Sequence, residues 1–176
     1  MKHIRNDLSC VPLRGNVETR VGKVASGAVD AIIIAQAGLN RLGLADKISA
    51  VLDPVEFPTA PAQGALAVQI RAGDDELAAM VCRLDDRNTR IAAETERHIL
   101  AAMHGGCSIP LGVHTRIEGD TITLAATISD FEGPRCIKRT ASSQIAGAAA
   151  MAEKLAAELL DAGAGEILEK VRRDKT

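Results

Sequence analysis

The spacing of apolar residues in the first part of the chain predicts alternating strands and helices. An uninterrupted β-branched run at 31–35 is typical of a strand buried on both faces of a parallel sheet. Apolar runs at 8–13 and 65–70 predict two further strands, and helical spacing predicts helices at 17–25 and 37–42. Strand, helix, strand and helix in this order favour an α/β arrangement.

From about Asp74 onward the pattern changes to longer helices and short alternating strands. Apolar residues at helical spacing predict four helices, at about 74–84, 89–103, 144–161 and 166–172. Alternation and β-branched residues predict three strands, at 111–117, 121–129 and 135–140. Because short turns join these strands, we expect a three-stranded antiparallel meander with helices on one face, in a small α+β domain.

Two details of this second part can be checked directly. In the helix at 89–103, an apolar stripe through Ile91, Thr95, Ile99 and Met103 predicts the buried face, which leaves Glu96 on the outer face. Ser142 or Ser143 is expected to cap the helix that follows the last strand.

Composition excludes several classes of function. The 176 residues carry a net charge of −2, with two Phe and no Trp or Tyr, so no nucleic-acid partner is expected. Four widely spaced cysteines without a Cys-x-x-Cys pair predict reduced thiols in a cytoplasmic protein. The N-terminal residues lack the apolar core of a signal peptide, and the longest apolar run is too short to cross a membrane.

The stretch 104–112 contains the most distinctive chemistry. Two glycines precede Cys107, so the thiol can stand on a tight open loop, where an accessible thiolate can be alkylated or can bind a metal. The alternative is a helix end followed by a small buried cysteine. A metal site with His98 and His104 is disfavoured because the spacing matches no familiar ligand set, and a Cys-His dyad lacks a third orienting group.

Two further sites are suggested by charge and turn chemistry. Arg14 and Arg20 flank the start of the first helix, where free backbone N–H groups favour anions and a guanidinium can clamp a carboxylate. The alternative is a solvated charged surface. Gln63 and Gly64 lie in a turn before the strand at 65–70, and Gln63 could equally be a structural turn residue.

Three ordered motifs resemble hydroxymethylbilane synthase, also called porphobilinogen deaminase. The stretch 13–20, Leu-Arg-Gly-Asn-Val-Glu-Thr-Arg, is similar to the family's Leu-Arg-Gly-Asn-x-x-Thr-Arg, and 63–65 matches its Gln-Gly-Ala turn. The family's Gly-Gly-Cys-x-x-Pro-x-Gly loop is matched by Gly105, Gly106, Cys107, Pro110 and Gly112. The resemblance extends from about Asn6 to the C-terminus.

The resemblance implies a covalent cofactor and a substrate. In the family, the cysteine of this loop carries a dipyrromethane through a thioether, which assigns that role to Cys107. The enzyme joins four porphobilinogens into hydroxymethylbilane for tetrapyrrole biosynthesis. Arg14, Arg20, Gln63 and Gly64 would then bind the cofactor and the acidic side chains of the pyrroles. No metal is implied.

The resemblance also implies a domain organisation. Residues 1–57 would be the back half of the family's second domain, a partial α/β domain of the periplasmic-binding-protein-like type. Residues 58–73 would be a crossover strand of the first domain, and 74–176 the C-terminal α+β domain that carries the cysteine. The catalytic aspartate of the family's first domain has no counterpart in this sequence.

Two functional interpretations follow from this missing part. The chain can be the C-terminal portion of a hydroxymethylbilane synthase, inactive alone and completed by a separate N-terminal fragment. Alternatively, it can be a non-catalytic module that binds a tetrapyrrole or another acidic ligand and has kept the fold.

Overall fold

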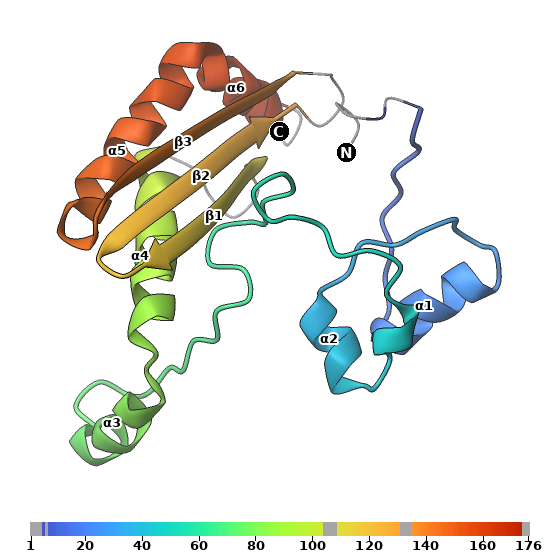
Figure 1. Cartoon of the computed structure of the whole chain (residues 1–176), viewed down its shortest axis with the longest axis horizontal. Helices are drawn as coiled ribbons and strands as arrows, with labels where there is room; N and C mark the ends of the chain where they lie inside the picture. The colour runs from blue at the N-terminus through green and yellow to red at the C-terminus, as the bar shows by residue number, and fades with distance from the viewer. Residues whose placement is uncertain (1–4, 6, 104–108, 131–134, 174–176) are drawn as a thin grey trace. The chain divides into compact units, whose positions relative to one another are not determined.

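The computed structural model describes residue 5 and residues 7–103, 109–130 and 135–173 (Figure 1). The chain divides into two compact units, Asp7–Asp53 and a second that comprises Pro54–Thr176 together with Met1–Asn6. Each unit is described by itself below.

The unit Asp7–Asp53 contains two short helices. The helices α1 (Val17–Ala25) and α2 (Gln36–Arg41) confirm the predicted ones, and a 3-10 turn follows at Ala45–Lys47. The first helix begins after Asn16, whose side-chain oxygen accepts the Thr19 N–H at 2.8 Å, as expected for an N-cap. Within the described part of this unit, Leu39 is the one buried side chain.

The predicted strands at 8–13, 31–35 and 65–70 do not form within the described chain. None of these runs pairs in a sheet, and Ile33 and Leu66 are 66% and 92% exposed. A β-branched run adopts a strand only beside a neighbour that accepts and donates its backbone hydrogen bonds, and the described residues offer these runs no such neighbour. The predicted parallel sheet is therefore not formed within the described chain.

The unit that begins at Pro54 is built on the predicted meander. Its strands are β1 (Leu111–Glu118), β2 (Thr121–Ser129) and β3 (Cys136–Gln144), antiparallel and in the order β1-β2-β3. Ser142 and Ser143 do not cap a helix, because β3 continues through them and pairs them with Thr123 and Ile122. The next helix begins beyond a 3-10 turn, Ile145–Gly147, without a side-chain cap.

Two helices, α4 (Arg87–Ala102) and α5 (Ala148–Leu159), cover one face of the sheet (Figure 1). The predicted stripe on α4 is confirmed, since Thr95, Ile99 and Met103 are buried. Before α4 come α3 (Asp75–Val81) and a 3-10 turn, Cys82–Leu84. After α5, a π-type turn at Leu160–Ala164 contains Gly163 at φ 95° and leads into α6 (Gly165–Arg173). The shared core explains why this part of the chain folds as an α+β domain.

Candidate functional site: the cysteine loop and the Gln63 turn

Cys107 itself lies outside the described residues, as do its neighbours from His104 to Ser108. Both ends of the loop that carries it are firmly anchored. Met103, at the end of α4, is 1% exposed, and Leu111, at the start of β1, is 3% exposed. In the sequence, Cys107 stands between a buried helix end and a buried strand start.

Gly112, the last glycine of the cysteine motif, lies against another part of the chain. A Cβ atom at this position would be 2.7 Å from the backbone oxygen of Pro58, which no side chain tolerates without a backbone shift. The next residue, Val113, donates its N–H to the Thr59 oxygen at 2.8 Å. The motif thus supplies the close approach that joins the segment at 58–59 to β1.

The Gln63 turn follows this segment directly. Gln63 and Gly64 are exposed, and backbone hydrogen bonds from Gln63 to Ala60 and from Ala65 to Ala62 close two successive turns. Gly64 has φ 91°, and Ala62 also lies in the left-handed region, at φ 58°. The Ala62 N–H donates to a carboxylate oxygen of Glu96 at 2.7 Å. The structure therefore holds the Gln63 turn against α4 as well as β1.

Arg14 and Arg20 belong to the other unit, at the start of α1. The Arg20 Nε donates to the Gly15 oxygen at 2.8 Å, which fixes this guanidinium beside the turn, while Arg14 is exposed. Gly15 has φ 123°, and a Cβ there would lie 2.8 Å from the Thr19 methyl group. The structure brings the two arginines to one helix start, and it places Gln63 and Gly64 in the unit that begins at Pro54.

Two contacts of this arrangement were not predicted. Glu96 was expected on the outer face of its helix, but it is half-buried and bonded to Ala62. The sequence contained a weak signal for this, since Glu96 directly follows buried Thr95 and so borders the apolar stripe. The close contact of Gly112 with Pro58 could not be predicted from the sequence, because the two residues are far apart in the chain.

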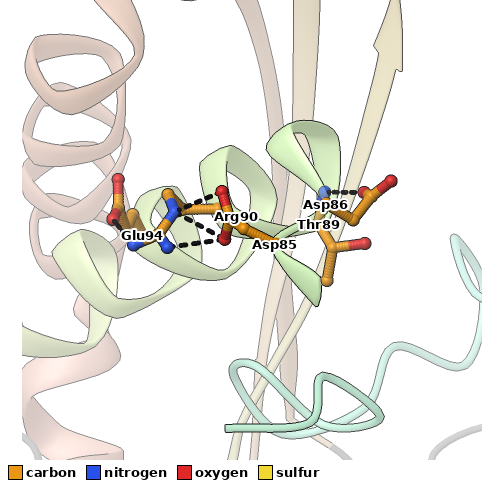
Figure 2. Close-up of polar contacts among 5 residues, drawn as sticks. All are labelled: Asp85, Asp86, Thr89, Arg90 and Glu94. Carbon is orange, nitrogen blue, oxygen red and sulfur yellow. Dashed lines mark hydrogen bonds and ion pairs between the residues drawn. The ribbon is translucent and has the colours of Figure 1, made fainter. Parts of the chain in front are cut away.

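The acidic residues before α4 form hydrogen bonds with the first turn of this helix. Asp86 accepts the Thr89 N–H at 2.7 Å, and Asp85 accepts the Arg90 Nε at 2.9 Å, while Glu94 lies 3.8 Å from the same guanidinium (Figure 2). The backbone hydrogen bond from Thr89 lowers the pKa of Asp86, and the Asp85 carboxylate raises the pKa of Arg90. Asp74 likewise caps α3 through the Leu77 N–H. Asp74 and Asp86 therefore stabilise helix starts.

The described residues offer no candidate for a metal site or a membrane-spanning helix. No group of three or more His, Cys, Asp or Glu side chains there could hold a metal ion. Across the same residues, no helix combines the length and apolar character needed to cross a membrane.

Comparison with known families identifies the two parts of the chain. Residues 1–79 match the family model described as "Porphobilinogen deaminase, dipyromethane cofactor binding domain". Residues 89–161 match the model described as "Porphobilinogen deaminase, C-terminal domain". The chain belongs to the porphobilinogen deaminase family, as the three sequence motifs predicted.

Individual relatives agree with this assignment. The porphobilinogen deaminase of Corynebacterium diphtheriae is 41% identical over 168 residues, which are 96% of this chain and 57% of the relative. The enzymes of Syntrophobacter fumaroxidans and Mycobacterium leprae are 36% and 40% identical and cover 98% and 93% of the chain. In these comparisons the chain spans 56% and 55% of the relatives. It therefore corresponds to little more than half of the proteins it matches.

Proposed function

We propose that this chain is the cofactor-carrying portion of a hydroxymethylbilane synthase, which polymerises porphobilinogen in tetrapyrrole biosynthesis. The observation that carries the proposal is the match of both family models, one of them named for the dipyrromethane cofactor, to a chain with the glycine-framed Cys107. We assign the covalent attachment to Cys107, because this cysteine lies in the Gly-Gly-Cys-x-x-Pro-x-Gly motif.

The donors present in the chain fit an acidic, pyrrole-based group. Arg14 and Arg20 stand at the start of one helix, where guanidinium forks and helix N–H groups favour carboxylates. Because the Arg20 Nε is engaged by Gly15, its terminal nitrogens are the part of the fork that a carboxylate would meet. Gln63 adds an amide on an exposed turn, which can both donate and accept hydrogen bonds.

These residues have distinct tasks in the proposed reaction. The dipyrromethane, when attached, would supply the terminal pyrrole carbon for chain growth. The Cys107 sulfur would hold it through a thioether bond, the two arginines would neutralise and orient the carboxylates of the rings, and Gln63 would orient a ring through its amide. Fixing both reacting rings removes much of the entropic cost of their encounter. The cationic species expected in such a reaction also need a nearby fixed anion.

We infer that this anion comes from a separate N-terminal fragment. The described carboxylates nearest in sequence to α4 are engaged in capping and ion pairs, which leaves them unsuited to the task. The run at 65–70, with Leu66 and Val68 exposed, supports a crossover strand at 58–73 that pairs with a sheet of that fragment. In this proposal, 1–57 is the partial second domain and 74–176 the C-terminal domain.

The test is product formation with and without the missing part. The chain is incubated with porphobilinogen, alone and together with the N-terminal remainder of the Corynebacterium diphtheriae relative, and uroporphyrin is measured after acid oxidation. We expect product from the complex and none from the chain alone. Sustained product from the chain alone would show that a local carboxylate suffices. Ligand binding by a stable complex that makes no product would instead favour a non-catalytic tetrapyrrole-binding module.

A further inference from the structure

The contact between Glu96 and Ala62 joins a helix to a turn 34 residues earlier in the chain. The Glu96 carboxylate accepts the Ala62 N–H at 2.7 Å, within the range of strong hydrogen bonds to an ionised acceptor. Glu96 is half-buried, in contrast to Glu94, which is exposed on the same helix. The two glutamates therefore differ in what they do, although the sequence pattern groups them.

Ala62, the residue that Glu96 contacts, has a strained backbone conformation. Ala62 has φ 58°, a left-handed conformation that costs a residue with a Cβ atom free energy relative to glycine. Such a conformation persists where the surroundings hold it in place. The Glu96 hydrogen bond at Ala62 and the Thr59–Val113 bridge three residues earlier supply this hold.

The backbone conformation of Ala62 affects the direction in which the Gln63 side chain leaves the turn. Gln63 lies between two residues with positive φ, Ala62 and Gly64, and its own N–H is bonded to the Ala60 oxygen. A change of Ala62 to an ordinary backbone conformation would turn the following peptide and redirect the Gln63 side chain. The amide is thus oriented by a residue that does not have to touch the substrate.

We propose that Glu96 is a positioning residue, which holds Ala62 in its left-handed conformation and thereby aims the Gln63 amide at the pyrrole substrate or cofactor. This rests on the proposed role of Gln63 in the deaminase reaction. A carboxylate at position 96 suits this role, because it provides a charged acceptor for the backbone N–H of the strained residue Ala62.

The first arm of the test measures the contact in the chain itself. Amide hydrogen exchange at Ala62 is compared in the wild type, Glu96→Leu and Glu96→Gln, with Glu94→Leu as the matched control on the same helix. We expect Glu96→Leu to speed exchange at Ala62 about tenfold, and Glu96→Gln to speed it less because an amide oxygen still accepts. The Leu124 amide, in the central strand, serves as the reference for global unfolding. Unchanged Ala62 exchange in Glu96→Leu would overturn the proposal.

The second arm measures positioning in the complex with the N-terminal fragment. Glu96→Leu should lower kcat about tenfold with a smaller change in KM, because a misdirected amide affects the placed reacting ring. Adding Ala62→Gly should recover most of kcat, since glycine adopts positive φ without the carboxylate. A double variant no more active than Glu96→Leu would contradict the proposal. A wild-type complex without product would overturn the proposed function, while Ala62 exchange still decides the Glu96 contact.

Discussion

The two units of the chain satisfy their hydrophobic patterns to very different degrees. In the unit that begins at Pro54, two helices bury their apolar stripes on one face of a sheet, and Ile99, Leu124 and Leu155 are fully buried. In Asp7–Asp53, Leu39 is the one buried side chain among the described residues, and Ile33 in a β-branched run is 66% exposed. The apolar pattern is therefore buried in the unit that forms a sheet and remains largely unburied in Asp7–Asp53.

The comparison has a direct bearing on function. The unit that begins at Pro54 contains the residues that flank the Cys107 motif and the Gln63 turn, while Asp7–Asp53 contains Arg14 and Arg20. Substitutions in each unit test how far it contributes to activity and stability.

Loss of the attachment cysteine should have the largest effect. In the complex with the N-terminal fragment, we expect Cys107→Ser to abolish uroporphyrin formation, because a hydroxyl is far less nucleophilic than a thiolate. Cys82→Ser, which changes an exposed cysteine at the end of α3, should keep full turnover. Intact mass and peptide mapping of the wild type should place a dipyrromethane on Cys107. A dipyrromethane on Cys82 or Cys136 would refute the assignment.

The arginines of the other unit should affect turnover without affecting folding. Arg14→Lys keeps the charge but loses the fork that fits a carboxylate, so turnover in the complex should fall about tenfold or more. Arg20→Lys should act similarly and also lose the bond to Gly15. Circular dichroism and thermal unfolding should remain close to the wild type. Normal turnover in both variants would leave the arginines as surface charges.

Gly112 should be important for stability, in contrast to a glycine of the other unit. Gly112→Ala places a Cβ 2.7 Å from the Pro58 oxygen, and we expect it to lower the free energy of unfolding by about 1–3 kcal/mol. Gly22→Ala, in the middle of α1, meets no atom within 4 Å. Its effect should be stabilising by up to about 1 kcal/mol, since alanine favours a helix. Urea unfolding measures both, and a harmless Gly112→Ala would contradict the observed contact.

The smallest effect should come from the cap of α4. Thr89 lowers the pKa of Asp86 below its ordinary value of 3.8, so the ionised carboxylate stabilises the folded state. This stabilisation is present above the unfolded pKa and is lost as the pH falls through the folded pKa. Asp86→Ala should therefore lower the melting temperature by a few degrees at pH 7 and by less at pH 3. Glu94→Ala, on the exposed side of α4, is the control, and an equal loss at both pH values would exclude the charge as the cause.

Much of the unit that begins at Pro54 could be predicted from the sequence, because the elements of its sheet follow one another along the chain. The three strands lie next to one another in the chain, and the stripe on α4 follows helical spacing. The predicted strands at 31–35 and 65–70 failed because a strand needs a neighbour that periodicity cannot supply. Ser142 and Ser143 were assigned to a helix cap because a serine pattern does not show that β3 continues to Gln144.

In the candidate site, only the residues that belong to short sequence motifs could be predicted. The Arg14 and Gln63 turns were found from short motifs, and both turns are present in the structure. Glu96 was missed because its place beside the apolar stripe is only a weak signal and its partner, a backbone N–H, cannot be inferred from residue types. The attachment at Cys107 stays a prediction, which the peptide map decides.

The close approach of Gly112 and Pro58 also constrains how this protein can evolve. A side chain at position 112 is admissible only if the backbone near position 58 moves away from β1, so the two positions should change together as sequences diverge. The same coupling affects any attempt to graft the cysteine loop onto another scaffold. A graft limited to the loop would leave its last glycine facing empty space, so the segment around Pro58 and Thr59 has to be transplanted with it.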